Sequence, residues 1–364
     1  MGCLVVGFGE IMGRLNPPGF SRFRQALPGG IEMTFAGAEA NVCASIAMLG
    51  GDSRYVTALP RHAIADACVD RLRGLGIDCS CIARTAKGRL GLYFVEKGAN
   101  QRPSVVIYDR EASSIAGAEP STYDWESVFS GADWLHISGI TPALSRAAAD
   151  SAAAAVAAAK HNGCKVSCDL NFRKKLWNWE PGTDARTLAQ RTMRGILVDV
   201  DVVIANEEDA HDVLGIQAGH TDVDSGRLEI DKYPAVAREI VKQFPKVSKV
   251  AITLRESISA SHNNWGAMLF DPGEDKAFFA PMRDGSYVPH EIRAIVDRVG
   301  GGDAFAAGLI FALNTPELAE SQKAVSFAVA ASCLAHSVEG DFNFCGRAEV
   351  EALMKGSASG RVQR

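Results

Sequence analysis

Three consecutive glycines and an acid, Gly300 to Asp303, are the residues of this chain whose types and spacing are best suited to chemistry. An apolar run at 295–299 predicts a strand before them, and the small and apolar residues after them predict a helix. Glycines at the start of a helix leave backbone N–H groups exposed, and the helix dipole favours an anion there. Such a nest, made by Gly300, Gly301 and Gly302, can stabilise the charge that grows on a transferring phosphoryl group.

Asp303 would lie in the first turn of that helix and face the same space. A carboxylate in this position can accept the proton of an attacking hydroxyl group, which makes Asp303 the candidate catalytic base. In the structural alternative, Asp303 only caps the helix and the glycines only form a turn. The motif taken alone does not decide between these two interpretations.

The elements that must position these residues are an alternating series of short strands and helices. Six apolar runs rich in β-branched residues predict a mostly parallel sheet covered by helices, in a doubly wound α/β fold. These runs span 4–8, 53–58, 134–138, 165–169, 200–205 and 249–253. An alanine-rich stretch at 143–160 predicts a helix that packs on the sheet and carries no chemistry.

Two stretches, 12–36 and 89–111, interrupt this series and predict strands outside the main sheet. We interpret them as one small β lid, discontinuous in the sequence, that covers a cleft. The rest of the chain would form one α/β domain that binds nucleotide and substrate; it comprises residues 1–11, 37–88 and 112–364. Exposed strand edges of the lid could pair with a second copy, which predicts a homodimer. A polar segment at 215–231 predicts a surface loop.

The composition narrows the partners to small molecules. The 364 residues are 47% hydrophobic and 22% charged, with a net charge of −5. No apolar run approaches the ~18 residues of a membrane span, and Lys and Arg are scattered, so we expect neither a membrane nor a nucleic acid as partner. Nine cysteines without a CxxC pair, and an N-terminus without a basic region, predict reduced thiols and a cytoplasmic protein.

A second glycine pattern, Gly7, Gly9 and Gly13, follows the first predicted strand and is typical of a dinucleotide-binding fingerprint. That fingerprint requires a helix to open at the glycines. The residues that follow include Pro17 and Pro18, which favour extended chain instead. An NAD-dependent oxidoreductase is therefore a distant alternative.

The glycine-aspartate segment resembles a signature of the ribokinase-like (phosphofructokinase-B) carbohydrate kinases, which runs Asp-x-x-Gly-Ala-Gly-Asp-x-Phe. Residues 297–305 read Asp-Arg-Val-Gly-Gly-Gly-Asp-Ala-Phe, with Gly301 in place of the usual alanine. A second signature, two small residues followed by Asn, is matched by Gly37, Ala38 and Asn41. The resemblance implies a ribokinase-like fold, a catalytic aspartate and a substrate site at the second signature. For that second piece alone, an ordinary capped helix is the alternative.

The same resemblance implies where ATP and magnesium bind. The family's motif Asn-x-x-Glu aligns with Asn206-Glu207-Glu208-Asp209, with an aspartate in place of the usual glutamate. A shorter carboxylate can still hold Mg²⁺ through water, and the choice among Glu207, Glu208 and Asp209 stays open. The nucleotide-binding residues implied by the family are Asn171, Asn206, Thr253, Arg255, Gly300 and Gly302. Arg255 could reach phosphates, and the alternative is a simple ion pair with a nearby acid.

Further stretches narrow the resemblance to the 2-keto-3-deoxygluconate kinases within that family. They span 91–94 with 108–110, 169–177 and 340–343. The substrate contacts that they and the signatures imply are Tyr93, Tyr108, Arg110, Arg173, Asp303 and Asp341. An arginine can hold a carboxylate in a bidentate fork, which a neutral sugar would not need. In the alternative, Arg110 and Arg173 are surface or structural ion-pair residues.

We therefore expect an ATP- and Mg²⁺-dependent kinase that phosphorylates the terminal hydroxyl of a sugar acid, 2-keto-3-deoxygluconate, to give the 6-phosphate. A kinase for a neutral sugar such as fructose or ribose is the nearest alternative. A relative that senses a sugar without catalysis is another, and the intact Asp303 argues against it.

Overall fold

A nine-stranded mixed sheet forms the centre of the protein. The structure, a computed structural model, describes residues 2–206, 208–216 and 230–356. The strand order is β14-β13-β12-β11-β10-β9-β1-β4, and β17 pairs with β13. The six strands from β12 to β4 in this order are parallel, whereas β13 pairs antiparallel with β12, β14 and β17. The strands are β1 (Leu4–Phe8), β4 (Asp52–Val56), β9 (Trp134–Ser138), β10 (Lys165–Asp169), β11 (Val202–Ala205), β12 (Lys249–Ser259), β13 (His262–Asp271), β14 (Lys276–Ala280) and β17 (His290–Ile292).

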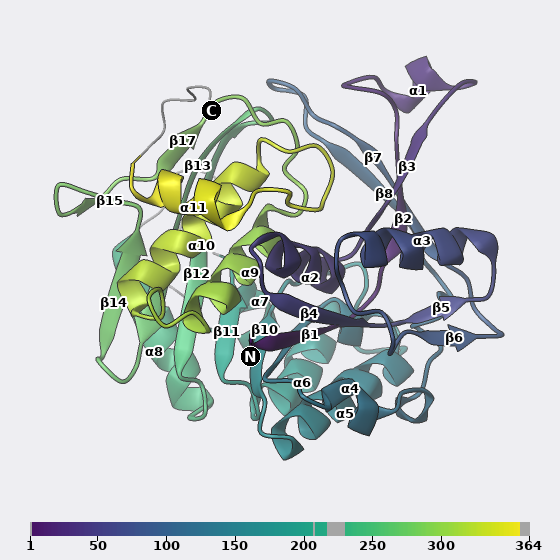
Figure 1. The fold of residues 1–364 in the computed structure, drawn as a ribbon, viewed down its shortest axis with the longest axis horizontal. Coiled ribbons are helices and arrows are strands. Elements are labelled where there is room, and N and C mark those ends of the chain that lie inside the picture. The colour runs from purple at the N-terminus through teal and green to yellow at the C-terminus, as the bar shows by residue number, and fades with distance from the viewer. Residues whose placement is uncertain (1, 207, 217–229, 357–364) are drawn as a thin grey trace.

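Helices cover both faces of this sheet (Figure 1). The apolar core of one face is formed with α2 (Ala38–Met48), α9 (Gly301–Leu313), α10 (Ser321–Ala335) and α11 (Arg347–Met354). The core of the other face is formed with α4 (Trp125–Phe129), α5 (Arg146–His161), α6 (Ala185–Leu197), α7 (Asp209–Leu214) and α8 (Tyr233–Gln243). A third cluster joins α3 (Ala63–Gly74) to α2 near the β4 edge. None of the helices in the described ranges is long and apolar enough to cross a membrane.

A separate four-stranded sheet, which we call the lid sheet, extends from this body at the upper right of Figure 1. Its strands, in spatial order, are β3 (Glu32–Ala36), β2 (Met12–Asn16), β7 (Gly91–Glu96) and β8 (Val105–Asp109), and the short helix α1 (Phe23–Ala26) connects β2 to β3. Because β2 pairs with β7, two segments that are distant in the sequence meet in one sheet. Two further ribbons join β5 (Ala58–Pro60) to β6 (Ala83–Thr85) and β15 (Met282–Arg283) to β16 (Ser286–Tyr287).

The α/β fold with a mostly parallel sheet and a small second sheet is confirmed, and each of the six apolar runs contains a strand of the main sheet. The alanine-rich stretch forms α5, which begins after Ser145, where the hydroxyl oxygen accepts the N–H of Ala148 over 3.0 Å. The strand predicted at 295–299 is wrong. Among the described residues, the segment pairs with no strand: the N–H of Ile295 donates to the carbonyl of Ser261, and the N–H of Val296 donates to the carbonyl of His336 at the end of α10. Most of the loop predicted at 215–231 lies outside the described residues.

Parallel pairing places the carboxyl ends of β1, β9, β10, β11 and β12 along one edge of the sheet. In open α/β sheets, ligands bind outside this edge. The edge residues include Asp169 at the end of β10, Asn206 just after β11, and Thr253 within β12. The fold therefore brings side chains from distant parts of the sequence to one place.

Candidate active site

A cavity of about 360 Å³ lies between the lid sheet and the carboxyl edge of the main sheet. Most of the site residues predicted from the sequence line it: Gly37, Ala38, Asn41, Tyr93, Tyr108, Arg110, Asn171, Arg173, Asn206, Asp209, Thr253, Arg255, Gly300, Gly301, Gly302, Asp303 and Asp341. Glu208 does not line it, and Glu207 lies outside the described residues. The predicted residues thus meet in a single space.

The glycine segment adopts the conformation that an anion nest requires at the start of α9. Gly300 precedes the helix with a left-handed φ of 86°, which favours glycine. A β-carbon there would lie 2.3 Å from the carbonyl oxygen of Asp341, so no larger residue fits. No atom would lie within 4 Å of a β-carbon on Gly302, so its backbone borders open space. The N-terminus of α9 therefore presents N–H groups to the cavity.

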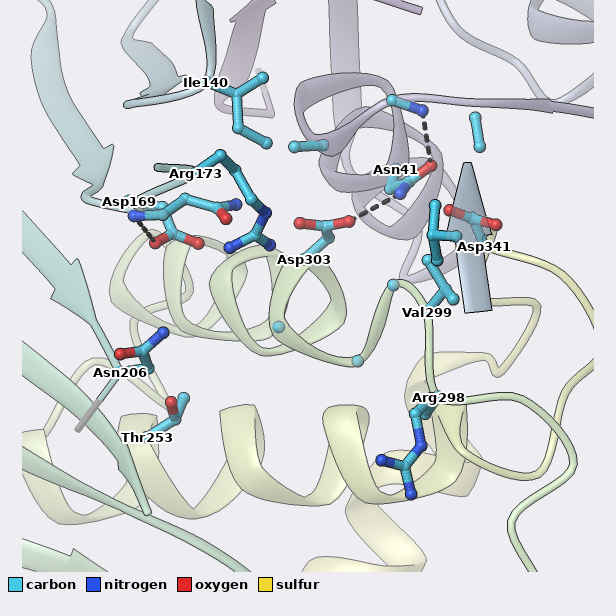
Figure 2. A pocket seen from close by; sticks show the side chains of 18 of the residues that line it. Asn41, Ile140, Asp169, Arg173, Asn206, Thr253, Arg298, Val299, Asp303 and Asp341 are labelled. Atoms are coloured by element: carbon cyan, nitrogen blue, oxygen red, sulfur yellow. Dashed lines mark hydrogen bonds between the residues drawn. The ribbon is translucent and has the colours of Figure 1, made fainter. Parts of the chain in front are cut away.

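Asp303 lies in the first turn of α9 and does not act as a simple cap. Nδ2 of Asn41 donates to Oδ2 of Asp303 over 2.6 Å, and the Gly300 position has no side-chain cap bond. Figure 2 shows both side chains at the cavity, with Asn41 coming from α2. Oδ1 of Asn41 accepts the N–H of Gly37 over 3.3 Å, so this amide links the two signatures that the sequence predicted to meet.

Burial raises the pKa of Asp303 to about 7, since a buried carboxylate loses its hydration. The charges of Asp341 and Glu39 raise the pKa further, whereas the hydrogen bond from Asn41 and the charge of Arg173 lower it. A carboxylate with this pKa is ionised in a large fraction near neutral pH and can accept a proton. The environment of Asp303 therefore suits a general base.

Two more acids, Asp169 and Asp209, line the same cavity as Asp303. Burial raises the pKa of Asp169, and the neighbouring charges of Asp209 and Asp303 raise it further. Burial also raises the pKa of Asp209. In Figure 2 the guanidinium of Arg173 reaches into the space between Asp169 and Asp303, and its charge lowers the pKa of all three acids. This end of the cavity carries excess negative charge that a cation would relieve.

These acids fit a magnesium ion that keeps most of its waters. Oδ1 of Asp209 accepts the N–H of Phe172, and Oδ2 accepts the N–H of Asn206, so the backbone already occupies both oxygens. Within the described ranges, no group of three His, Cys, Asp or Glu side chains could enclose a metal. Mg²⁺ commonly binds through one or two carboxylates, waters and phosphates rather than in a protein cage. The donor set therefore suits an ion that arrives with a phosphate ligand.

The lid side of the cavity is held by two buried ion-pair networks. Arg14 on β2 contacts Asp297 over 2.5 Å and also pairs with Asp341, whose second oxygen accepts the hydroxyl of Tyr93 over 2.9 Å. Arg110 pairs with Glu10 through Nε over 2.7 Å and through Nη2. The ion-pair interpretation of Arg110 is thus observed, although the same residue lines the cavity.

The end of the cavity that Asn206 and Thr253 line lies across the first turn of α9 from Asp341. Figure 2 places Asn206 and Thr253 together there, and Oγ1 of Thr253 donates to the carbonyl of Ala205 over 3.4 Å. Asn171, with a left-handed φ of 36°, donates its N–H to Oδ1 of Asp169 over 3.1 Å. The nucleotide residues implied by the family all line this space.

Several cavity residues were missing from the sequence-based site: Glu10, Asp169, Asn263, Trp265, Arg298 and His336. Glu10 and Asp169 had a usable signal, because each lies at or just beyond the end of an apolar run. Asn263 and His336 had none, since they belong to a hairpin and to the end of a helix that meet only in the folded chain.

The early glycine pattern has a packing explanation. Gly7 lies within β1, and a β-carbon there would lie 2.6 Å from the sulfur of Cys43 on α2. A β-carbon at Gly9 would lie 2.0 Å from Oε2 of Glu39 on the same helix. The chain then enters β2 rather than a helix, so the structure lacks the context that dinucleotide binding requires here.

A buried acid in the first turn of a helix that follows a glycine nest, at the carboxyl edge of an α/β sheet, is the arrangement of a phosphotransferase site. The chain belongs to the pfkB family carbohydrate kinases, whose pattern matches residues 4–345.

Three members of that family with related names are similar to this chain over nearly its whole length. The crystal structure of a 2-dehydro-3-deoxygluconokinase from Thermotoga maritima is 41% identical, with a TM-score of 0.86 over 98% of this chain and 99% of that one. A 2-dehydro-3-deoxygalactonokinase of Haloferax volcanii is 29% identical over 98% of each chain. A 2-dehydro-3-deoxygluconokinase of Thermoproteus tenax is 29% identical over 93% of this chain and 89% of its own.

Proposed function

We propose that this carbohydrate kinase transfers the γ-phosphoryl group of ATP to the terminal hydroxyl of 2-keto-3-deoxygluconate, which is the 2-dehydro-3-deoxygluconate of its relatives' names. The observation that carries the proposal is Asp303, a buried acid of pKa about 7 in the first turn of the helix that follows the glycine nest. Base and anion nest thus face one cavity.

The chain's own residues account for most of the reaction. Asp303 accepts the proton of the terminal hydroxyl, and the N–H groups at Gly301 and Gly302 hold the developing charge of the phosphoryl group. Mg²⁺, held through water near Asp209, would neutralise phosphate charge. Closure of the lid sheet excludes water, which would otherwise hydrolyse ATP.

For the substrate, Arg173 and Arg110 are proposed to hold the carboxylate, with Tyr93 and Tyr108 beside the sugar. Arg173 is exposed and lines the cavity, and within the described ranges the one hydrogen bond of its side chain goes to the carbonyl of Phe172 over 3.1 Å. It can therefore turn its remaining N–H groups to a ligand. The second candidate substrate is 2-keto-3-deoxygalactonate, which differs only in the configuration of C4 and matches the relative from Haloferax volcanii.

A substrate panel tests the proposal. With ATP and Mg²⁺, kcat/KM should be highest for one of the two sugar acids and at least about 100-fold lower for fructose and ribose, because only an acid uses the arginines. Arg173→Met should reduce kcat/KM for the acid and leave the slow neutral sugars nearly unchanged. Faster turnover of a neutral sugar would overturn the sugar-acid assignment.

We also propose a homodimer formed through the lid sheet and a cytoplasmic location. β8 is an edge strand, and its side chains at 105–108 are between 39% and 54% exposed, although all four are apolar or aromatic. Such an edge can add a strand from a second copy. Val106 and Tyr108 also line the cavity, so a partner strand would lie beside the substrate. All nine cysteines are unpaired, which suits a reducing compartment.

A further inference from the structure

Glu10 lies in the short connection where the chain leaves β1 of the main sheet and enters β2 of the lid sheet. It is 3% exposed and lines the cavity together with Tyr93 and Arg110. Asp303 already supplies the base for phosphoryl transfer. Glu10 pairs with Arg110, but that ion pair uses only one of its two carboxylate oxygens.

The two carboxylate oxygens of Glu10 are used unequally. Nε and Nη2 of Arg110 both donate to Oε2, the first over 2.7 Å. Oε1 has no hydrogen-bond partner among the residues that the structure describes. Buried polar atoms are almost always paired, and leaving a charged one unpaired is especially costly. The unpaired oxygen points to a donor that the surrounding protein does not supply.

Oε1 of Glu10 lies next to a glycine, which has no side chain to crowd it. A β-carbon at Gly91, the first residue of β7, would lie 2.9 Å from Oε1 and 3.2 Å from Cβ of Arg110. Any larger residue would therefore press on both partners of the ion pair. Gly91 leaves room for Glu10 beside the cavity wall.

The ion pair with Glu10 also determines which N–H donors of Arg110 are left for a ligand. Its guanidinium carbon lies 5.5 Å from the ring centre of Tyr108, and Glu10 takes donors from Nε and Nη2. A guanidinium has five N–H donors, so three remain, two on Nη1 and one on Nη2. The orientation of these donors depends on Glu10 and Tyr108.

We propose that Glu10 is a substrate-binding residue. Oε2 orients Arg110 toward the carboxylate of the sugar acid, and Oε1 accepts a hydrogen bond from one of its non-reacting hydroxyl groups, at C4 or C5. This inference rests on the proposed sugar-acid kinase function and deepens it. A carboxylate can accept but not donate, so the site requires a donor hydroxyl in one configuration and can discriminate between epimers.

Glu10→Gln provides a sharp test, because arginine only donates. The amide carbonyl must face Arg110, which places the NH₂ group where Oε1 was and turns an acceptor into a donor. Substrates in which fluorine replaces the C4 or the C5 hydroxyl can accept but not donate. We expect wild type to lose at least about 100-fold in kcat/KM with one of these fluoro analogues. In Glu10→Gln, the ratio of kcat/KM for that fluoro analogue to kcat/KM for the parent sugar acid should be at least about tenfold higher than in wild type.

Glu96→Gln is the matched control. Glu96 is an acid on β7 of the lid sheet, its Oε1 accepts the N–H of Phe23 over 2.7 Å, and it does not line the cavity. For Glu96→Gln, the ratio of kcat/KM for each fluoro analogue to kcat/KM for the parent acid should equal the ratio in wild type. Thermal melting and ATP affinity of Glu10→Gln would show whether the fold is kept.

The outcomes separate the two proposals. In one outcome, the enzyme phosphorylates the parent acid, and the ratio of kcat/KM for the fluoro analogue to kcat/KM for the parent is the same in wild type and Glu10→Gln at both C4 and C5. This outcome overturns the role of Glu10 but leaves the proposed kinase function standing. If Glu10→Gln does not fold, wild type still decides, since full turnover of both fluoro analogues overturns the role. Failure of wild type to phosphorylate any sugar acid would instead overturn the proposed function.

Discussion

The reactivity of the site depends on the pKa of Asp303, which neighbouring groups shift in opposite directions. Asp303 loses hydration inside the protein, and the charges of Asp341 and Glu39 favour its protonation. Asn41 and Arg173 act in the opposite direction by favouring the ionised form. The result is a pKa of about 7, which lets a carboxylate act as an effective base near neutral pH.

At the scale of single residues, the pH dependence of turnover is the first prediction. Because Asp303 is active as a base only when ionised, kcat/KM should be low in acid and rise as the pH increases through about 7. Asn41→Ala removes the hydrogen bond that lowers this pKa, so the midpoint should move to higher pH. A profile of kcat/KM against pH at saturating ATP measures both. An unchanged midpoint in Asn41→Ala would contradict the assignment of the base.

The side chains that act together were only partly predictable from the sequence. The glycine nest and Asp303 are contiguous, so the sequence predicts them as one site, and the other family signatures favour phosphoryl transfer over a simple helix cap. Arg14 meets Asp297 and Asp341 across 283 and 327 residues, and no local pattern encodes such a pairing. Likewise, the sequence showed Arg110 as a candidate ligand for a carboxylate but did not show that Glu10 already holds it.

At the scale of elements, Arg14 ties the lid sheet to the glycine segment. Asp297 precedes that segment and accepts the N–H of Val299 over 3.2 Å. The carbonyl of Asp341 packs against Gly300. One guanidinium on β2 thus pairs with two acids that flank the start of α9.

Removal of this guanidinium should be costly. Arg14 is 1% exposed, and Arg14→Met would leave two buried acids without their partner, a loss of about 3–5 kcal/mol in the free energy of unfolding. Urea denaturation followed by circular dichroism measures the change. The matched control is Arg89→Met, which breaks an exposed pair with Asp109 on the same lid sheet and should have little effect. Equal stability of the two variants would contradict the role of Arg14.

At the scale of the whole molecule, the parallel sheet brings Asp169, Asn206 and Thr253 to one edge, facing the lid sheet across the cavity. This arrangement was predictable, because short β-branched runs alternate with helical segments along the chain. The strand predicted at 295–299 was not correct, since apolar residues there anchor a loop instead of pairing in a sheet. The position of the lid over the cavity depends on contacts between distant segments, which periodicity does not reveal.

The proposed dimer gives a prediction at this scale. Ile107→Lys places a charge on the exposed edge strand β8, where the wild-type side chain is 54% exposed, and should convert a dimer to a monomer. Val198→Lys, at an equally exposed apolar residue beyond α6, is the control and should stay dimeric. Light scattering after size-exclusion chromatography reports the mass of each. A wild-type monomer, or an Ile107→Lys dimer, would contradict an interface at β8.

The central claim is that Asp303, at the glycine nest, is the base of a phosphoryl transfer. It is tested most directly by the turnover of Asp303→Asn with ATP, Mg²⁺ and 2-keto-3-deoxygluconate, measured as ADP release beside the sugar-acid affinity from calorimetry. The account predicts a fall in kcat of about 10²–10⁴-fold, with affinity changed only slightly, because asparagine keeps the shape but cannot take the proton. Wild-type turnover by Asp303→Asn would contradict it.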